Sequence, residues 1–182
     1  MVSKVVRGRM MFVALITLFA LPAVVAKFFL VNQWYESGVT NKGLLIEPKQ
    51  SYENLGVNNP YTGQQWQLGY LVPAKCNEFC YRQIHLLGQS HVALGKYQSR
   101  VAPVLLLSKV SDHVSLDKNS FNRIKVNDAF HNLISDFELV IIDPLGQLVM
   151  RYPVVENERD LVSQSKDILT DLRKLLKLSR VG

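Results

Sequence analysis

The strongest constraint on how this chain folds is its central stretch, which carries both of its cysteines. Alternating apolar residues predict a strand over residues 66–72, and a continuous apolar run predicts another over residues 104–107. Between them, residues 77–96 favour a helix. Cys76 and Cys80 therefore stand in a Cys-x-x-x-Cys spacing at the junction where a strand gives way to a helix.

The sulfurs at this junction are placed for chemistry. Unpaired amides and the dipole at a helix start favour the thiolate form, and Lys75 adds positive charge beside Cys76. Cys80 lies one turn further along the same side, so the two sulfurs can form a disulfide or hold a soft ion such as Cu(I). A purely structural disulfide is the alternative, but it would close a loop of only a few residues and constrain the unfolded chain little.

A long apolar segment near the amino terminus indicates a membrane anchor. Residues 10–31 can cross a bilayer, and the basic residues of segment 1–9 place the amino terminus in the cytoplasm. Trp34 and Tyr35 fit the interfacial aromatic belt on the far side. A signal peptide cut after residues 24–26 is the alternative, which the apolar residues that follow disfavour. Either interpretation exports the domain to a compartment where cysteines that can meet tend to oxidise.

Net charge gives no sign of a nucleic-acid partner. The chain carries 21 Lys and Arg against 15 Asp and Glu, a formal charge of +6. Four of the basic residues lie in the first 35 positions, which hold no acid, so the remainder has 17 basic against 15 acidic residues, or +2. We find no basic stripe with interleaved aromatic residues and expect no nucleic-acid binding.

Other elements are predicted from local patterns. Residues 32–63 are expected to form a linker with a short strand near residues 44–46, which ends at Pro48. Residues 121–130 hint at a helix within an irregular segment. The last element is a strongly amphipathic helix over residues 158–178, whose apolar face is expected to cover a sheet.

A hairpin completes the pattern. Strands are predicted over residues 139–142 and 147–152, joined by a type I turn in which Asp143 is a turn residue rather than a catalytic acid. Short strands joined by helices and followed by an antiparallel pair describe an α/β protein, with a mixed sheet flanked by helices on both faces. This order is expected of a thioredoxin-like domain, here spanning residues 64–182.

A Cu(I) ion bound by two cysteines would still require a third ligand, for which a neutral imidazole is well suited. His85 and His91 lie well along the helix from the cysteines and are interpreted as ordinary helix residues. His113 falls in a polar link and is interpreted as solvated. His131 precedes the hairpin, whose entry lies near the cysteine loop in such a sheet, although spacing alone favours a surface or packing role.

Several stretches of this chain match one known family. They are CNEFC with the helix QIHLLGQSHVALGKYQSRV, the hairpin ELVIIDPLGQLVMRYP and the terminal DLRKLLKLSRVG, which together span most of the chain from Trp66 onward. Through them the chain resembles the Sco/SenC family of thioredoxin-like, membrane-anchored copper proteins that assist cytochrome c oxidase assembly. It is most similar to a proteobacterial branch of small single-pass proteins associated with that oxidase.

The resemblance implies roles for individual residues. Cys76 and Cys80 would be the thiol pair that binds copper or cycles through a disulfide. When the hairpins are aligned, the copper-binding histidine of the family falls at Ser135, with His131 one helical turn earlier. A shifted loop would let His131 complete the copper site. Tyr81 stands where the family has a proline directly after the second cysteine.

Three functions are hypotheses at this point. The first is an assembly factor, anchored in the bacterial inner membrane with a periplasmic domain, that delivers copper to cytochrome c oxidase or keeps its copper-site cysteines reduced. The second is a thiol–disulfide oxidoreductase, in which Cys76 attacks a target disulfide and Cys80 resolves the mixed disulfide. Against it, no proline precedes the strand that begins at Leu139, where thioredoxin-type oxidoreductases place a cis-proline. The third is a structural partner of the oxidase with a fixed disulfide. The expected partners are a cytochrome c oxidase subunit or its assembly proteins and, through residues 10–31, the lipid bilayer.

Overall fold

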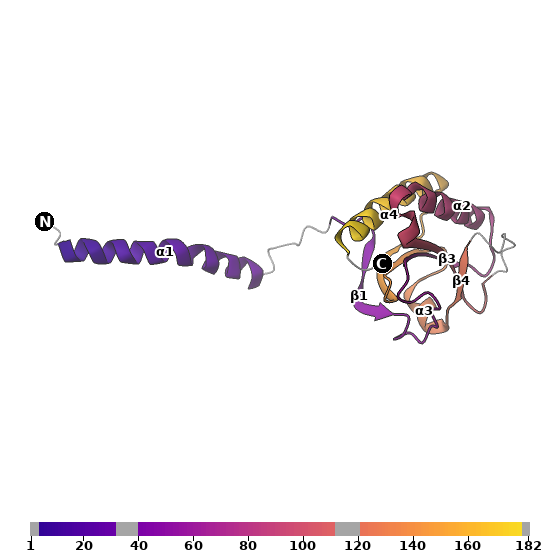
Figure 1. Ribbon diagram of the computed structural model, residues 1–182, viewed down its shortest axis with the longest axis horizontal. Coiled ribbons are helices and arrows are strands. Elements are labelled where there is room, and N and C mark those ends of the chain that lie inside the picture. The colour runs from indigo at the N-terminus through magenta and orange to yellow at the C-terminus, as the bar shows by residue number, and fades with distance from the viewer. Residues whose placement is uncertain (1–3, 32–39, 112–120, 180–182) are drawn as a thin grey trace. The chain divides into compact units, whose positions relative to one another are not determined.

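The structure is a computed structural model that describes residues 4–31, 40–111 and 121–179 (Figure 1). The chain divides into two compact units, Met1–Thr40 and Asn41–Gly182. Among the described residues, the first unit contains one helix, and the second contains the strands, both cysteines and the remaining helices.

The helix of the first unit is α1 (Lys4–Val31). Its segment Val6–Phe29 is long and apolar enough to cross a membrane, with a mean hydropathy of 2.3, and none of that segment is buried. At its amino end the helix extends beyond the predicted span of residues 10–31. Trp34 and Tyr35, predicted to lie at the membrane interface, are outside the described residues.

One six-stranded sheet forms the centre of the second unit. Its strands are β1 (Leu44–Ser51), β2 (Trp66–Val72), β3 (Val101–Leu107), β4 (Asn122–Lys125), β5 (Leu139–Ile142) and β6 (Gln147–Tyr152). They lie in the order β1-β6-β5-β2-β3-β4. β2, β3 and β4 run parallel, whereas β5, β6 and β1 are added antiparallel. The predicted mixed sheet is confirmed.

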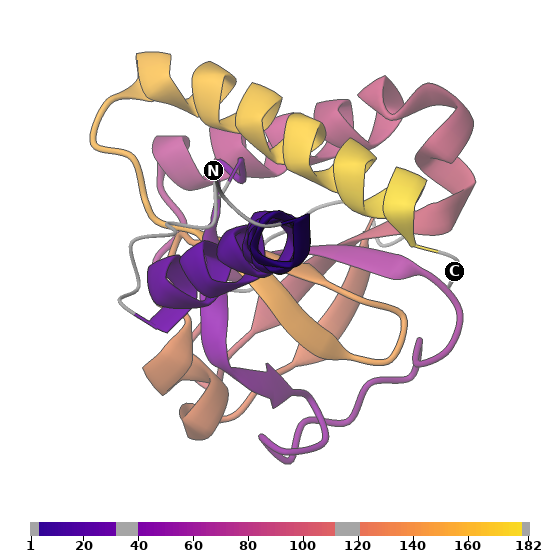
Figure 2. The same ribbon diagram turned by 90° about the vertical axis from the view of Figure 1, so that its left-hand side faces the viewer.

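Helices cover both faces of the sheet, as predicted. α2 (Glu78–Ala93) and α4 (Glu158–Leu178) lie side by side over one face, and the short α3 (Asp128–Leu133) lies on the other (Figure 2). A short 3-10 helix, Gly95–Arg100, follows α2. The bounds of α4 equal the predicted residues 158–178, because its apolar stripe repeats at helical spacing.

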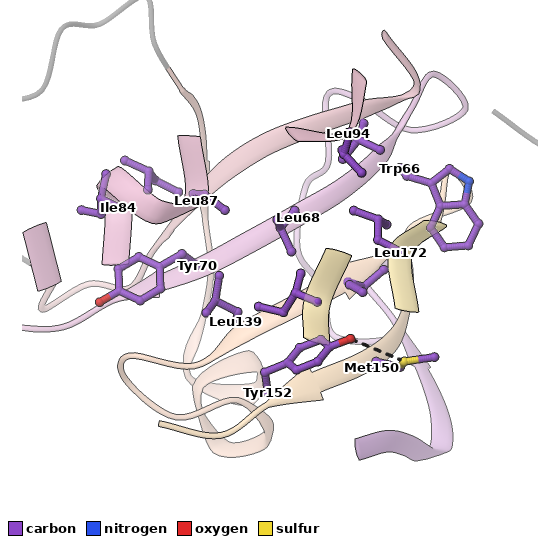
Figure 3. Close-up of a cluster of buried hydrophobic side chains, with 14 of the residues drawn as sticks. Trp66, Leu68, Tyr70, Ile84, Leu87, Leu94, Leu139, Met150, Tyr152 and Leu172 are labelled. Carbon is purple, nitrogen blue, oxygen red and sulfur yellow. Dashed lines mark hydrogen bonds between the residues drawn. The ribbon is translucent and has the colours of Figure 1, made fainter. Parts of the chain in front are cut away.

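Two apolar clusters hold these layers together, one on each face of the sheet. Alternation along β2 divides its residues between them. Leu68 and Tyr70 face α2 and α4 (Figure 3), whereas Leu71 belongs to the cluster on the α3 side. Gly69 also faces the α3 side, where an added Cβ would come within 2.9 Å of Leu106 Cδ1. Each fully buried leucine stabilises the fold by about 1.5–3 kcal/mol, so both faces contribute.

The helix predicted over residues 121–130 is wrong in its first half. β4 occupies that half and pairs in parallel with β3. Only Ile124 of this strand is buried, which is the alternation of a strand at the edge of a sheet. α3 follows, and its start is capped by Asn127, whose Oδ1 accepts a hydrogen bond from the N–H of Phe130 at 3.1 Å.

The first strand does not end at Pro48, as predicted, but continues to Ser51. β1 lies at the edge of the sheet, where a residue without an amide hydrogen is tolerated. Its pairing with β6 shifts between Leu45 and Gln50, and Pro48 lies inside that irregularity. The proline therefore interrupts the ladder without ending the strand.

A buried carboxylate fastens the start of the second unit to its last helix. Asp171 of α4 is 1% exposed. Its Oδ2 accepts hydrogen bonds from the N–H of Lys42 at 2.7 Å, from the N–H of Gly43 at 2.9 Å and from the hydroxyl of Tyr152 at 3.0 Å. Gly43 permits this approach, because an added Cβ would lie 2.6 Å from Cζ of Tyr152. Three donors on Oδ2 offset part of the cost of burying the carboxylate, whose Oδ1 has no hydrogen-bond partner among the described residues.

Candidate functional site

The loop that carries the cysteines begins at the carboxyl end of β2. Every residue of β2 is buried, and Pro73 ends the strand because it has no amide hydrogen to give to the sheet. Ala74 and Lys75 are exposed, so the chain turns toward solvent before it reaches Cys76. The loop therefore lies at the surface of the domain while its two ends are fixed in the core.

Asn77 sets the geometry of the helix that follows. Its backbone is extended, with φ −96° and ψ −175°, and its Oδ1 accepts a hydrogen bond from the N–H of Cys80 at 3.0 Å. Cys80 thus lies in the first turn of α2, where unpaired amides and the helix dipole favour negative charge on sulfur. Cys76 and Cys80 are joined by a disulfide bond, with their Cα atoms 5.2 Å apart.

The two sulfur-bearing residues differ in their access to solvent. Cys80 is 0% exposed and belongs to the apolar cluster beneath α2. Cys76 is half-buried and packs against the edge of that cluster. An incoming thiolate would therefore reach Cys76 first, and the departing sulfur would be that of Cys80.

An aromatic pair borders the disulfide loop. Phe79 lies inside the loop and Phe137 lies just before β5, and their ring centroids are 5.8 Å apart at an interplanar angle of 67°. The N–H of Phe137 donates a hydrogen bond to the carbonyl of Leu71 at 3.0 Å, so this segment runs beside the end of β2. Phe137 has a φ of 68°, a left-handed conformation that is unfavourable for a bulky side chain and that is found at functional sites.

A buried glutamate stands directly before β5, where a thioredoxin-type oxidoreductase would carry its proline. Glu138 is 7% exposed, and its Oε2 lies 4.0 Å from Arg151 Nη1 and 3.4 Å from the amide nitrogen of Ser135. Burial raises the pKa of Glu138, while the Ser135 hydrogen bond and the Arg151 charge oppose part of that rise. The folded domain therefore takes up a proton here more readily than the unfolded chain does.

The histidine predicted as a third ligand pairs with a carboxylate. His131 lies on α3, and its Nε2 is 3.0 Å from Asp136 Oδ1, with the two side chains 38% and 32% exposed. Among the residues that the structure describes, no three His, Cys, Asp or Glu side chains gather closely enough to hold a metal ion. A metal-binding role for His131 together with Cys76 and Cys80 stays a prediction.

The two histidines of α2 have ordinary local surroundings. His85 is exposed on α2. His91 lies in the last turn of the same helix, with its Nε2 3.2 Å from the carbonyl oxygen of Gln98. His113 lies outside the described residues.

A family model described as "Transmembrane-like, thioredoxin-like, C-terminal domain" matches residues 66–179. The chain belongs to this family. Its membership confirms the predicted thioredoxin-like fold, and the candidate membrane helix precedes the matched residues. No curated protein matches the chain in sequence.

Solved structures similar to this thioredoxin-like chain include Sco proteins and a disulfide oxidoreductase. ScoI of Arabidopsis thaliana, with copper bound, is 14% identical with a TM-score of 0.43, covering 63% of this chain and 87% of that one. BsSco, a member of the Sco family of cytochrome c oxidase assembly proteins with a disulfide switch, is 12% identical with a TM-score of 0.42, covering 76% and 97%. A secreted disulfide oxidoreductase of Mycobacterium tuberculosis is 16% identical with a TM-score of 0.41, covering 60% and 84%. Sco structures are thus among those that this chain resembles, as its sequence motifs indicate.

The buried polar groups around the thioredoxin-like site are not found by sequence patterns. Tyr70 is expected only as a residue of β2, and Glu138 only as the residue before β5. One signal points to Tyr70. A tyrosine at an inward-facing position of a strand brings a hydroxyl into the core, and that hydroxyl needs a partner.

Proposed function

We propose that this protein is a membrane-anchored assembly factor for cytochrome c oxidase that works through Cys76 and Cys80. Its task is to reduce the copper-site cysteines of the oxidase or to hand copper to them. The observation that carries the proposal is the disulfide at the start of α2, with half-buried Cys76 at the surface and Cys80 in the core. The Sco/SenC resemblance of the sequence supports the choice of partner.

The reduced form of the pair begins the proposed exchange. The Cys76 thiolate attacks one sulfur of a disulfide in the acceptor, which forms a mixed disulfide and releases the other acceptor sulfur as a thiolate. Cys80 then attacks the sulfur of Cys76, and the bond to the acceptor breaks. Two electrons have passed to the acceptor, the Cys76–Cys80 disulfide has formed, and a dithiol reductant outside the cytoplasm reduces it again.

The amino-terminal helix supports action at a membrane. Basic residues precede the apolar span and no excess of them follows it directly, which favours a cytoplasmic amino terminus and a periplasmic domain at the bacterial inner membrane. The proposed organisation is a cytoplasmic segment 1–9, an anchor 10–31, a segment 32–63 that holds a linker with the first strand and its loop, and the thioredoxin-like domain 64–182. Within segment 32–63, β1 adds an edge strand to the sheet of that domain. An anchored domain meets partners held in the same bilayer, as the oxidase is.

Copper delivery is the second form of the proposal, with Cu(I) as the cargo. Once the disulfide is reduced, Cys76 and Cys80 supply two soft ligands that suit this ion. His131 is the proposed third ligand, and it would have to leave Asp136 to take that role. Ligand exchange with thiolates of the acceptor would then move the ion.

A single set of samples separates these functions. The full-length chain in detergent is reduced, freed of reductant without oxygen, and titrated with Cu(I) as wild type, Cys76→Ser and His131→Ala. The same samples are mixed with two oxidised peptides, one carrying the cysteine pair of an oxidase copper site and one carrying an unrelated disulfide. Reduction that favours the copper-site peptide and is lost in Cys76→Ser is the expected result for a redox assembly factor.

The other outcomes each assign a different function. Stoichiometric Cu(I) binding that is lost in Cys76→Ser supports delivery, and weaker binding in His131→Ala assigns the third ligand. Equal reduction of both peptides favours a general thiol–disulfide oxidoreductase. If the protein neither binds Cu(I) nor reduces either peptide, the proposal is contradicted, and the remaining function is that of a structural partner with a fixed disulfide.

A further inference from the structure

Tyr70 carries an unsatisfied polar group in the core next to the disulfide loop. Its side chain is 0% exposed, and its hydroxyl has no hydrogen-bond partner among the described residues. Burial raises the pKa of Tyr70, and the charge of Asp136 raises it further, so the hydroxyl remains a protonated donor. Asp136 precedes Phe137, whose ring contacts Phe79 inside the disulfide loop.

The position of Tyr70 places this donor toward the end of β2 that leads into the cysteine loop. Tyr70 lies near the end of β2, three residues before Pro73, and belongs to the same apolar cluster as Cys80 and Ile84. Figure 3 shows its ring below Ile84, with the hydroxyl pointing away from Leu68 and the middle of the cluster. The hydroxyl thus lies on the side of the core from which the cysteine loop leaves the sheet.

The hydroxyls of the other two buried tyrosines among the described residues have hydrogen-bond partners. The Tyr52 hydroxyl donates to Gln67 Oε1 at 3.2 Å, and the Tyr152 hydroxyl donates to Asp171 Oδ2 at 3.0 Å. Buried hydroxyls in folded proteins are as a rule paired, and one left unpaired is destabilising. Tyr70 is therefore the exception among these buried tyrosines, and its hydroxyl would be satisfied only in a state of the protein that offers it an acceptor.

Opening the disulfide creates such an acceptor. A neutral sulfur accepts hydrogen bonds weakly, whereas a thiolate accepts a charge-assisted one. When a small thiol attacks Cys76, the bond to Cys80 breaks and its electron pair remains on the Cys80 sulfur as a thiolate. A second thiol then attacks the mixed disulfide, departs with the first as a small-molecule disulfide, and leaves Cys76 reduced.

We propose that Tyr70 is a positioning residue that donates a hydrogen bond to the Cys80 sulfur once the disulfide is open, and thereby favours the reduced form of the pair. The oxidised form keeps an unsatisfied hydroxyl, whereas the reduced form satisfies it. The inference rests on the proposed function only in requiring that the disulfide opens while the domain stays folded.

The test is the equilibrium of the full-length chain in detergent with reduced and oxidised glutathione, read by thiol alkylation and mass spectrometry. Tyr70→Phe removes only the hydroxyl. We expect its equilibrium constant for reduction to be about tenfold below that of the wild type, equivalent to about 30 mV. Tyr52→Phe is the matched control, because it removes a satisfied hydroxyl from the other face of the sheet, and its constant should equal that of the wild type.

Each of the other results contradicts the role of Tyr70, the proposed function, or both. An unchanged or higher constant in Tyr70→Phe overturns the role of Tyr70 and leaves the proposed function intact. An equal fall in Tyr52→Phe traces the effect to lost packing and also overturns it. A wild-type disulfide that opens only when the chain unfolds overturns both. The expected tenfold shift without peptide reduction or copper binding overturns the proposed function alone.

Discussion

Replacing Asp171 by alanine tests how the second unit is held at the point where the chain enters it. The substitution removes the acceptor of three hydrogen bonds, from the N–H groups of Lys42 and Gly43 and from the Tyr152 hydroxyl. Each buried donor left unpaired costs about 1–3 kcal/mol, and one of the three, at Lys42, is only partly buried. We expect the free energy of unfolding to fall by about 3–5 kcal/mol.

Urea unfolding of the full-length chain in mild detergent, followed by near-ultraviolet circular dichroism, measures this loss. Thermal unfolding should show a midpoint lower by roughly 10 °C for such a change. Asp167→Ala is the control, because Asp167 lies one turn earlier on α4 and is only half-buried. It should change the free energy of unfolding by no more than about 0.5 kcal/mol. A loss below about 1 kcal/mol in Asp171→Ala, or equal losses in both variants, would refute the reasoning.

Two further predictions concern the same unit. Gly43→Ala should lower the free energy of unfolding by about 1–3 kcal/mol, because the added Cβ would lie 2.6 Å from Cζ of Tyr152. An unchanged midpoint of urea unfolding would contradict this prediction. Because burial raises the pKa of Glu138, the folded state binds more protons than the unfolded chain between the ordinary and the raised pKa, so stability falls as pH rises through that window. In Glu138→Gln, the midpoint of urea unfolding should fall less than that of the wild type between about pH 4 and about pH 7. Equal falls in the two proteins would contradict this prediction.

Sequence patterns predict the elements whose geometry is decided locally. The predicted helix 158–178 and the predicted strands 139–142 and 147–152 coincide with α4, β5 and β6, since apolar spacing and a turn motif define them. β4 is different, because its few residues become a strand through pairing with β3 and not through a pattern of their own. The error in the first half of the helix predicted over residues 121–130 follows from this dependence on a distant partner.

Of the candidate site, the two cysteines can be predicted from the sequence. Their spacing and the start of α2 are local features, so the sequence places both sulfurs at one junction. The burial of Tyr70 and Glu138 depends on segments that pack over them from elsewhere in the chain, and patterns in a short window do not contain it. Asp171 is the extreme case, because two of its hydrogen-bond donors precede it by 128 and 129 residues.

Reaction at Cys76, with Cys80 as the resolving sulfur, is most directly tested by the two single-cysteine variants. Cys80→Ser and Cys76→Ser of the full-length chain, folded in detergent, are mixed with an aromatic disulfide reagent, and release of the coloured thiolate is followed. We predict that Cys80→Ser, which keeps half-buried Cys76, reacts at least about tenfold faster than Cys76→Ser, which keeps the buried Cys80. Equal rates, or a faster reaction of Cys80, would contradict the proposed roles of both residues.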